Sequence, residues 1–132
     1  MKYPSTVYRV SVKAAIFDGN DRILLVKEHS EELSLPGGGL EHYESIRENL
    51  TRELKEEISE DVEIVSISRS PLFAWTAYPE DVPKMSIAYL VDIKPPEVST
   101  RDRTFAYYPI NEETLDLVEE PSRGFLRFWM DK

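Results

Sequence analysis

The chain has 132 residues, a formal net charge of −9 and no cysteine. This length predicts one domain, residues 1–132, that buries roughly two-thirds of its unfolded surface. The missing cysteine excludes disulfides, a cysteine nucleophile and cysteine-ligated zinc. Proteins that wrap nucleic acid polymers are normally basic, so the acidic charge argues against a nucleic acid partner. A small anionic substrate stays open as the alternative if metal ions screen the negative charge of the protein.

The apolar residues are spread along the chain in short runs, none of which is long enough to span a membrane. The first ten residues, MKYPSTVYRV, lack the apolar core of a signal peptide. We therefore expect no membrane partner and a cytoplasmic protein. The oligomeric state, monomer or homodimer, stays open.

The first elements in chain order are two strands. Residues 7–17 are largely apolar or β-forming, which predicts a strand, and the Asp-Gly-Asn-Asp of residues 18–21 predicts a turn. Residues 22–28 contain an unbroken apolar run, so we expect a buried strand that forms an antiparallel hairpin with the first. Residues 29–35 are expected to form a loop.

A helix over residues 46–58 is the best-supported element. Ser45 and Glu48 make the Ser-x-x-Glu pattern of a capping box, and no glycine or proline interrupts residues 46–58. Apolar residues recur at every fourth position and form one stripe. Those residues are Ile46, Leu50, Leu54 and Ile58.

Three glutamates of this helix depart from the pattern of a solvated face. Glu57 falls inside the apolar stripe, whereas Glu53 and Glu56 lie along its edge. Partly desolvated carboxylates repel one another, and a hard divalent cation such as Mg²⁺ relieves that conflict. The Gly-Gly-Gly of residues 37–39 is expected to form a loop that lets the backbone approach a ligand closely, just before a helix N-terminus. Each feature alone is typical of a solvated helix or a plain turn; together they predict a metal–phosphate site.

The remaining elements predict more strands and then terminal helices. Strands are expected at residues 62–75, with a break at Pro71, at 84–93, and at 104–108 before Pro109; helices are expected from Asn111 to Glu119 and from Ser122 onwards. Strands before and after one helix, and then two more helices, indicate a mixed sheet covered by helices on both sides.

The stretch at residues 38–60 resembles the signature box of the Nudix (MutT-like) hydrolases. That box is a glycine, five residues, a glutamate, seven residues, and Arg-Glu-aliphatic-x-Glu-Glu-x-Gly-aliphatic. The matching positions here are Gly38, Glu44, Arg52, Glu53, Leu54, Glu56 and Glu57. Three positions depart from the family pattern: Ser59 replaces the closing glycine, Tyr43 stands where many members have glycine, and Asn49 stands where a small apolar residue is usual.

The resemblance implies a fold and a chemistry. The fold is the Nudix α/β/α sandwich with a mixed β-sheet between helices. The activity is hydrolysis of a nucleoside diphosphate linked to another moiety, in which water attacks phosphorus with Mg²⁺ or Mn²⁺ as the cofactor. A Nudix-fold domain that binds or senses a nucleotide or metabolite with little turnover is the alternative.

The resemblance also implies residue roles, by position in the box. It makes Glu53, Glu56 and Glu57 the metal ligands and, with Arg52, the catalytic group. It places Gly38 near the metal, and it gives substrate binding or loop support to Gly37, Gly39 and Glu44. Whether Glu56 or Glu57 deprotonates water is open.

Two further contributions are expected from outside the box. A distal carboxylate often completes such sites, and the candidates are Glu80, Asp81, Glu97 and Asp102. Aromatic side chains often stack on the base of the substrate, and the candidates are Phe73, Trp75, Tyr78, Tyr107, Phe128 and Trp129.

Overall fold

The computed structural model describes residues 7–27, 31–78, 82–94 and 105–132. The strands are β1 (Arg9–Ala15), β2 (Arg22–Val26), β3 (Gly37–Gly39), β4 (Glu63–Ile67), β5 (Phe73–Ala77), β6 (Lys84–Lys94) and β7 (Phe105–Pro109). The helices are α1 (Ile46–Glu57), α2 (Glu112–Leu115) and α3 (Glu120–Met130). In the described part of the chain, no helix is long and apolar enough to cross a membrane.

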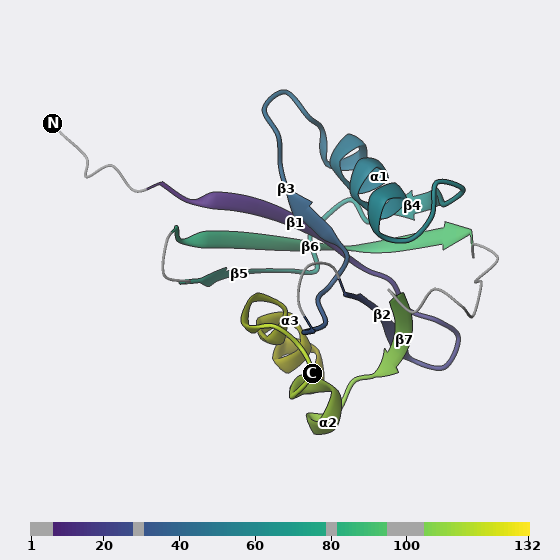
Figure 1. The fold of residues 1–132 in the computed structure, drawn as a ribbon, viewed down its shortest axis with the longest axis vertical. Coiled ribbons are helices and arrows are strands. Elements are labelled where there is room, and N and C mark those ends of the chain that lie inside the picture. Colours follow the sequence, from purple (N-terminus) through teal and green to yellow (C-terminus); the bar gives the residue numbers. More distant parts are fainter. Residues whose placement is uncertain (1–6, 28–30, 79–81, 95–104) are drawn as a thin grey trace, which may run out of the picture.

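The main sheet has five strands and is mixed. Its order is β3-β1-β6-β4, and β5 also pairs with β6 (Figure 1). β1 and β6 run parallel, with Arg9 opposite Lys84, whereas β3, β4 and β5 pair antiparallel with their neighbours. A second sheet consists of β2 and β7. β1 therefore lies between the glycine strand and β6.

Helices cover both faces of the main sheet, as expected for an α/β/α sandwich. On one face, Val12 and Ala14 of β1 pack in a core cluster with Leu50 and Leu54 of α1. On the other face, the neighbouring Ala15 belongs to a second cluster with residues of α3. Because successive strand residues point to opposite faces, β1 contributes to both cores, and Figure 1 shows α1 on the side of the sheet away from α2 and α3.

The predicted hairpin of the first two strands is wrong in its pairing. β2 forms its ladder with β7, and the described contact with the end of the first strand is one isolated bridge between Phe17 and Ile23. The reason is burial on both faces: Leu24 and Val26 lie in the first core cluster, whereas Ile23 and Leu25 lie in the second. β2 thus stands between the two cores.

Other elements also differ from the prediction, and one predicted break is confirmed. The glycine segment, expected as a loop, is strand β3, because its backbone pairs with β1 from Gly39 opposite Ser11 to Gly37 opposite Lys13. The stretch 62–75 is two strands, β4 and β5, which confirms a break near Pro71. The helix expected from Asn111 to Glu119 is shorter, because α2 ends at Leu115. The last helix, α3, begins at Glu120, before the expected Ser122. Its Glu-Pro start fits the preference for proline in the first helical turn.

Candidate active site

The start of α1 is held by the capping box. The Glu48 N–H donates to the Ser45 hydroxyl at 3.1 Å, and the Ser45 N–H donates to the Glu48 carboxylate at 3.1 Å. These bonds satisfy two donors that a helix otherwise leaves open at its N-terminus. The cap fixes where α1 begins, and with it the direction in which each later side chain points.

Two of the predicted metal ligands lie against the glycine strand. Glu53 and Glu57 are each 8% exposed. The Gly37 N–H donates to Oε1 of Glu57 at 2.9 Å. A Cβ on Gly38 would overlap the Glu53 carboxylate, so any larger residue there would displace that side chain from its position. The structure therefore places Glu57 on the buried face of α1, as predicted from its position in the apolar stripe.

Glu56, the third predicted ligand, is more exposed than these two, although it lies near the same Arg52 nitrogen as Glu53. Its side chain is 60% exposed, and its Oε1 lies 3.8 Å from Nη1 of Arg52. Within residues 7–27, 31–78, 82–94 and 105–132, no group of three or more His, Cys, Asp or Glu side chains is gathered closely enough to hold a metal ion. Glu53 and Glu57 are thus the two predicted ligands that contact the glycine strand.

Arg52 connects the acidic residues of the loop and of the helix. It donates from Nε to Oε2 of Glu44 at 2.9 Å, from Nη2 to Oε1 of Glu44 at 3.1 Å, and from Nη1 to Oε1 of Glu53 at 2.9 Å. The hydrogen bonds from Arg52, and then that from Asn49, lower the pKa of Glu44 to about 2. In return, Glu44 first and Glu53 second raise the pKa of Arg52. Glu44 and Arg52 are therefore held in their charged forms.

Asn49 extends the same network from inside the protein. Its side chain is fully buried, and its Nδ2 donates to the Gly39 carbonyl at 2.9 Å and to Oε1 of Glu44 at 3.0 Å. Its Oδ1 is buried and accepts no hydrogen bond from the described residues. This departure from the family pattern therefore adds a direct link between α1 and the end of β3.

The other two departures lie at the loop and at the end of the helix. Tyr43 has a φ of 66°, in the left-handed region where glycine is favoured. Among the described residues, the non-glycine positions with positive φ are Tyr43 and Asp21, so Ser59 is not left-handed. Its hydroxyl instead accepts a hydrogen bond from the Asp61 N–H at 3.1 Å.

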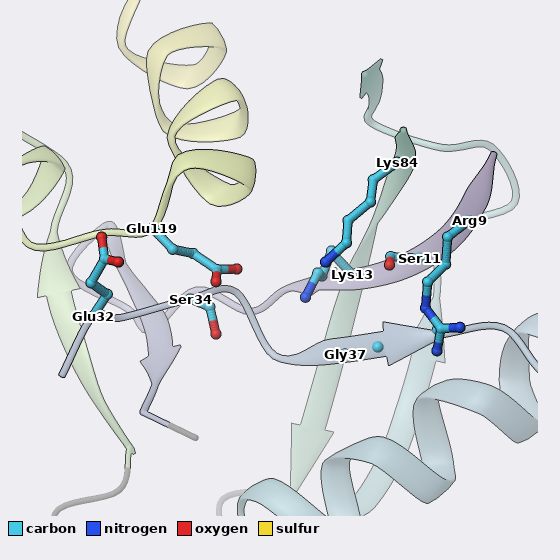
Figure 2. A pocket seen from close by; sticks show the side chains of 10 residues that line it. Arg9, Ser11, Lys13, Glu32, Ser34, Gly37, Lys84 and Glu119 are labelled. Atoms are coloured by element: carbon cyan, nitrogen blue, oxygen red, sulfur yellow. The ribbon is translucent and has the colours of Figure 1, made fainter. Parts of the chain in front are cut away.

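A polar cavity of about 260 Å³ opens beside β3. Besides the three strand glycines, its walls carry the charged residues Arg9, Lys13, Lys84, Glu32 and Glu119 (Figure 2). The Arg9 guanidinium lies against Gly39, since a Cβ on that glycine would overlap it. Three basic side chains thus gather, in an acidic protein, next to the strand that Glu53 and Glu57 contact.

Sequence reasoning missed these basic residues, although part of the signal was present. Positions 9, 11 and 13 are polar and alternate with apolar positions 10, 12 and 14, which is the period of a strand with one polar face. Lys84 joins them because it lies opposite Arg9 in the parallel ladder. No local pattern indicates that pairing.

Most of the aromatic candidates are partly buried and pack against the core. Phe73 stacks on Phe128 with ring centroids 4.1 Å apart, and both pack against the second core cluster. Those that pack against a core cluster are Phe73, Trp75, Tyr107, Phe128 and Trp129. Tyr78 is 70% exposed and remains available to a ligand. The distal acidic candidates Glu80, Asp81, Glu97 and Asp102 lie outside the described residues.

Comparison with known proteins identifies the family to which the chain belongs. Residues 7–128 match the family described as the NUDIX domain. No curated protein matches the sequence. The chain is similar in structure to the E. coli ORF135 protein, with a TM-score of 0.71 and 22% identity, covering 96% of this chain and 91% of that one.

Two other solved structures are similar over nearly their whole length. One is a MutT Nudix hydrolase from Burkholderia pseudomallei, with a TM-score of 0.68 and 21% identity over 92% of this chain and 97% of that one. The other is the Ap4A hydrolase of C. elegans, with a TM-score of 0.68 and 17% identity over 95% of this chain and 97% of that one. The mixed, curled sheet with its helices is thus the Nudix fold.

Proposed function

Because this chain belongs to the Nudix family, we propose that it is a metal-dependent pyrophosphohydrolase. It hydrolyses a nucleoside diphosphate linked to another moiety, and water attacks phosphorus. One observation carries this proposal: the buried carboxylates of Glu53 and Glu57 lie against a glycine strand that also forms the wall of a basic cavity. An acidic site beside a basic pocket suits a diphosphate bound together with a cation.

The donor groups present fit Mg²⁺ or Mn²⁺. Mg²⁺ is typically held by one or two protein carboxylates, with water and substrate phosphate oxygens completing its shell. Glu53 and Glu57 supply two such carboxylates, and we propose Glu56 as a further ligand from the exposed edge of the site. When bound, the ion would neutralise charge that develops on the phosphates and lower the pKa of water.

The protein groups around these carboxylates have positioning roles. Arg52 holds Glu53 through Nη1 at 2.9 Å, and the Gly37 N–H holds Glu57 at 2.9 Å. Glu44 anchors Arg52 on its other side. Such hydrogen bonds fix the directions of carboxylate oxygens before the substrate arrives, which reduces the reorganisation needed for reaction.

Glu56 and Glu57 are the two candidates for the base that takes a proton from water. Glu57 is buried and already accepts a hydrogen bond from the backbone, whereas Glu56 is exposed and can exchange its proton with solvent. Comparing the pH profiles of Glu56→Gln and Glu57→Gln separates them. The variant that lacks the base loses the acidic limb of the profile for kcat.

The basic wall of the cavity is proposed to bind the diphosphate. Arg9 lies against Gly39, and Lys84 lies opposite Arg9 in the ladder. A guanidinium forms paired hydrogen bonds with phosphate oxygens, and an ammonium adds a point charge. These groups offset the repulsion that a net charge of −9 would exert on an anionic substrate.

A Nudix-fold domain that binds or senses a nucleotide without turnover is the second candidate. The exposure of Glu56 favours it, together with the finding that the described residues contain no cluster of three acidic side chains placed to hold a metal ion. Both candidates require the same basic cavity, so turnover decides between them.

A product assay tests the proposal. The purified protein is incubated with Mg²⁺ or Mn²⁺ and a panel of nucleoside triphosphates, dinucleotides, ADP-ribose, nucleotide sugars and dinucleoside polyphosphates, and the products are resolved by mass. Glu57→Gln is the blank. We expect cleavage of one class at its diphosphate, lost in the blank. Binding by calorimetry without turnover across the panel would support the sensing domain instead.

A further inference from the structure

The proposed metal ligands Glu53 and Glu57 belong to a longer row of polar side chains on α1, which lies beside β3 (Figure 1). Residues four apart share one face of a helix, so Asn49 is the preceding member of this row. The Gly37 N–H donates to Glu57 at 2.9 Å, and a Cβ on Gly38 would overlap the Glu53 carboxylate. The row thus follows the glycine strand in the opposite chain direction.

Asn49 takes the remaining position of the row, at the end of β3. It is fully buried, and its Nδ2 donates to the Gly39 carbonyl at 2.9 Å and to Oε1 of Glu44 at 3.0 Å. The peptide that carries this carbonyl is also held from β1, because the Leu40 N–H donates to the Val10 carbonyl at 2.9 Å. The end of the glycine strand is therefore fixed between β1 and α1.

The two acceptors of the Asn49 amide also face Arg52. Nη2 of Arg52 lies 3.1 Å from Oε1 of Glu44 and 3.4 Å from the Gly39 carbonyl, so Asn49 makes the shorter bond to that carbonyl. The other guanidinium nitrogens contact Glu44 from Nε and Glu53 from Nη1, each at 2.9 Å. Without the amide, Nη2 would be the remaining side-chain donor to the carbonyl among the described residues. The guanidinium would then turn towards Gly39 and away from Glu53.

We propose that Asn49 is a positioning residue for the hydrolysis: its amide holds the end of the glycine strand and thereby keeps Arg52 aligned on Glu53. The inference depends on the proposed function, which makes Glu53 a metal ligand. Asn49 acts through Arg52 and not by contact with the metal or the substrate. Residues that orient metal ligands from outside typically change metal affinity or activity by roughly 10- to 100-fold.

This role is separable from stability. Oδ1 of Asn49 is buried and accepts no hydrogen bond from the described residues, which is an arrangement that costs stability. Leucine has nearly the same shape and removes Oδ1 and Nδ2 together. Arg52 still faces both acceptors that Nδ2 leaves. Asn49→Leu should therefore fold with a Tm close to that of the wild type.

The test measures kcat and KM of Asn49→Leu with Mg²⁺ and the substrate found in the product assay. We expect kcat to fall by roughly tenfold or more. KM should stay within about twofold, because the basic residues of the cavity remain in place. Thr51→Val is the matched control: it also replaces a polar side chain by an apolar one of the same shape, and it lies about 200° around the helix from Asn49. Asn49→Ala repeats the test with a side chain that adds no bulk.

A double-mutant cycle tests the route through Arg52. If Asn49 acts through this side chain, Asn49→Leu should lower kcat much less in the Arg52→Lys background than in the wild type. Effects that multiply independently would overturn this route. The metal-free protein gives a second readout by NMR: the Arg52 Nε–H should exchange with water several-fold faster in Asn49→Leu, and at the wild-type rate in Thr51→Val.

Wild-type kcat in both Asn49→Leu and Asn49→Ala would overturn the inference. A large fall in Tm with kcat and KM changed together would show a merely structural role and would also reject it. If the wild type turns over no substrate, the proposed activity fails separately, and Mn²⁺ titrations decide together with the Arg52 exchange rate. Weaker Mn²⁺ binding and faster exchange in Asn49→Leu would support the inference. Unchanged exchange, or equal Mn²⁺ titrations of the two proteins, would reject it.

Discussion

Arg52 donates to both carboxylate oxygens of Glu44, from Nε at 2.9 Å and from Nη2 at 3.1 Å. One planar guanidinium thereby ties the loop after β3 to the middle of α1, while its remaining nitrogen, Nη1, holds Glu53 at 2.9 Å. The loop and the helix that carry the proposed chemistry are therefore coupled through a single side chain.

Arg52→Lys tests this coupling. A lysine keeps the positive charge but cannot make the paired bonds to Glu44 and a third bond to Glu53. We expect turnover to fall by roughly tenfold or more, as for other groups that orient metal ligands. Steady-state kinetics measures it, and Lys55→Arg, on the exposed face of the same helix, is the control. Wild-type turnover in Arg52→Lys would show that charge alone suffices.

The low pKa of Glu44 gives a defined pH dependence of stability. The folded-state pKa of about 2 lies below the ordinary value of 4.5. The stabilisation by Glu44 is therefore complete above pH 4.5 and is lost as the pH falls towards 2. Urea unfolding at a series of pH values should show wild type and Glu44→Gln converging in stability across this window. A constant difference between them would contradict the ion pair.

Divalent metal should stabilise the folded protein, because the proposed site exists only in the folded state. At a concentration ten times the dissociation constant, the gain is about 1.4 kcal/mol, or several degrees in Tm. Melting curves with Mg²⁺ or Mn²⁺ measure it. The shift should vanish in Glu53→Gln and in Glu57→Gln and persist in Glu60→Gln. An equal shift in all four proteins would place the metal elsewhere.

Tyr43→Gly should stabilise the protein. Tyr43 has a φ of 66°, and its side chain is fully exposed, so the change relieves backbone strain and sacrifices no burial. A left-handed conformation costs a residue other than glycine about 1 kcal/mol, partly offset by the greater freedom of glycine in the unfolded chain. Chemical denaturation should give Tyr43→Gly a higher free energy of unfolding than both the wild type and Tyr43→Ala. Equal stability of the Gly and Ala variants would rule out strain as the cause.

Ser59→Gly should destabilise the protein, which is the opposite effect to that of Tyr43→Gly. Its backbone is not left-handed, and its hydroxyl accepts the Asp61 N–H at 3.1 Å. Glycine removes this bond and adds freedom to the unfolded chain, so we expect a loss of about 1 kcal/mol. Ser59→Ala separates the two contributions, because it removes the bond alone. A gain in stability on Ser59→Gly would mean that the helix exit is left-handed after all.

The local sequence was sufficient to specify α1 and the side chains that the helix presents. The cap at Ser45, the apolar stripe and the intrusion of Glu57 into that stripe were all predicted, and the structure confirms them. Helical hydrogen bonds and side-chain contacts join residues at most about four positions apart, so a short stretch of sequence contains the information.

The residues that surround this helix were instead set by contacts between distant parts of the chain. Residues 37–39 form a strand because they pair with β1. β2 pairs with β7 instead of forming the predicted hairpin, and both of its faces are buried. Lys84 lies opposite Arg9 in the parallel ladder between β1 and β6. The bridge between Leu33 and Val118 brings the segments that carry Glu32 and Glu119 together. Strand pairing joins residues at any separation, and its register depends on burial of the whole sheet, which no local pattern specifies.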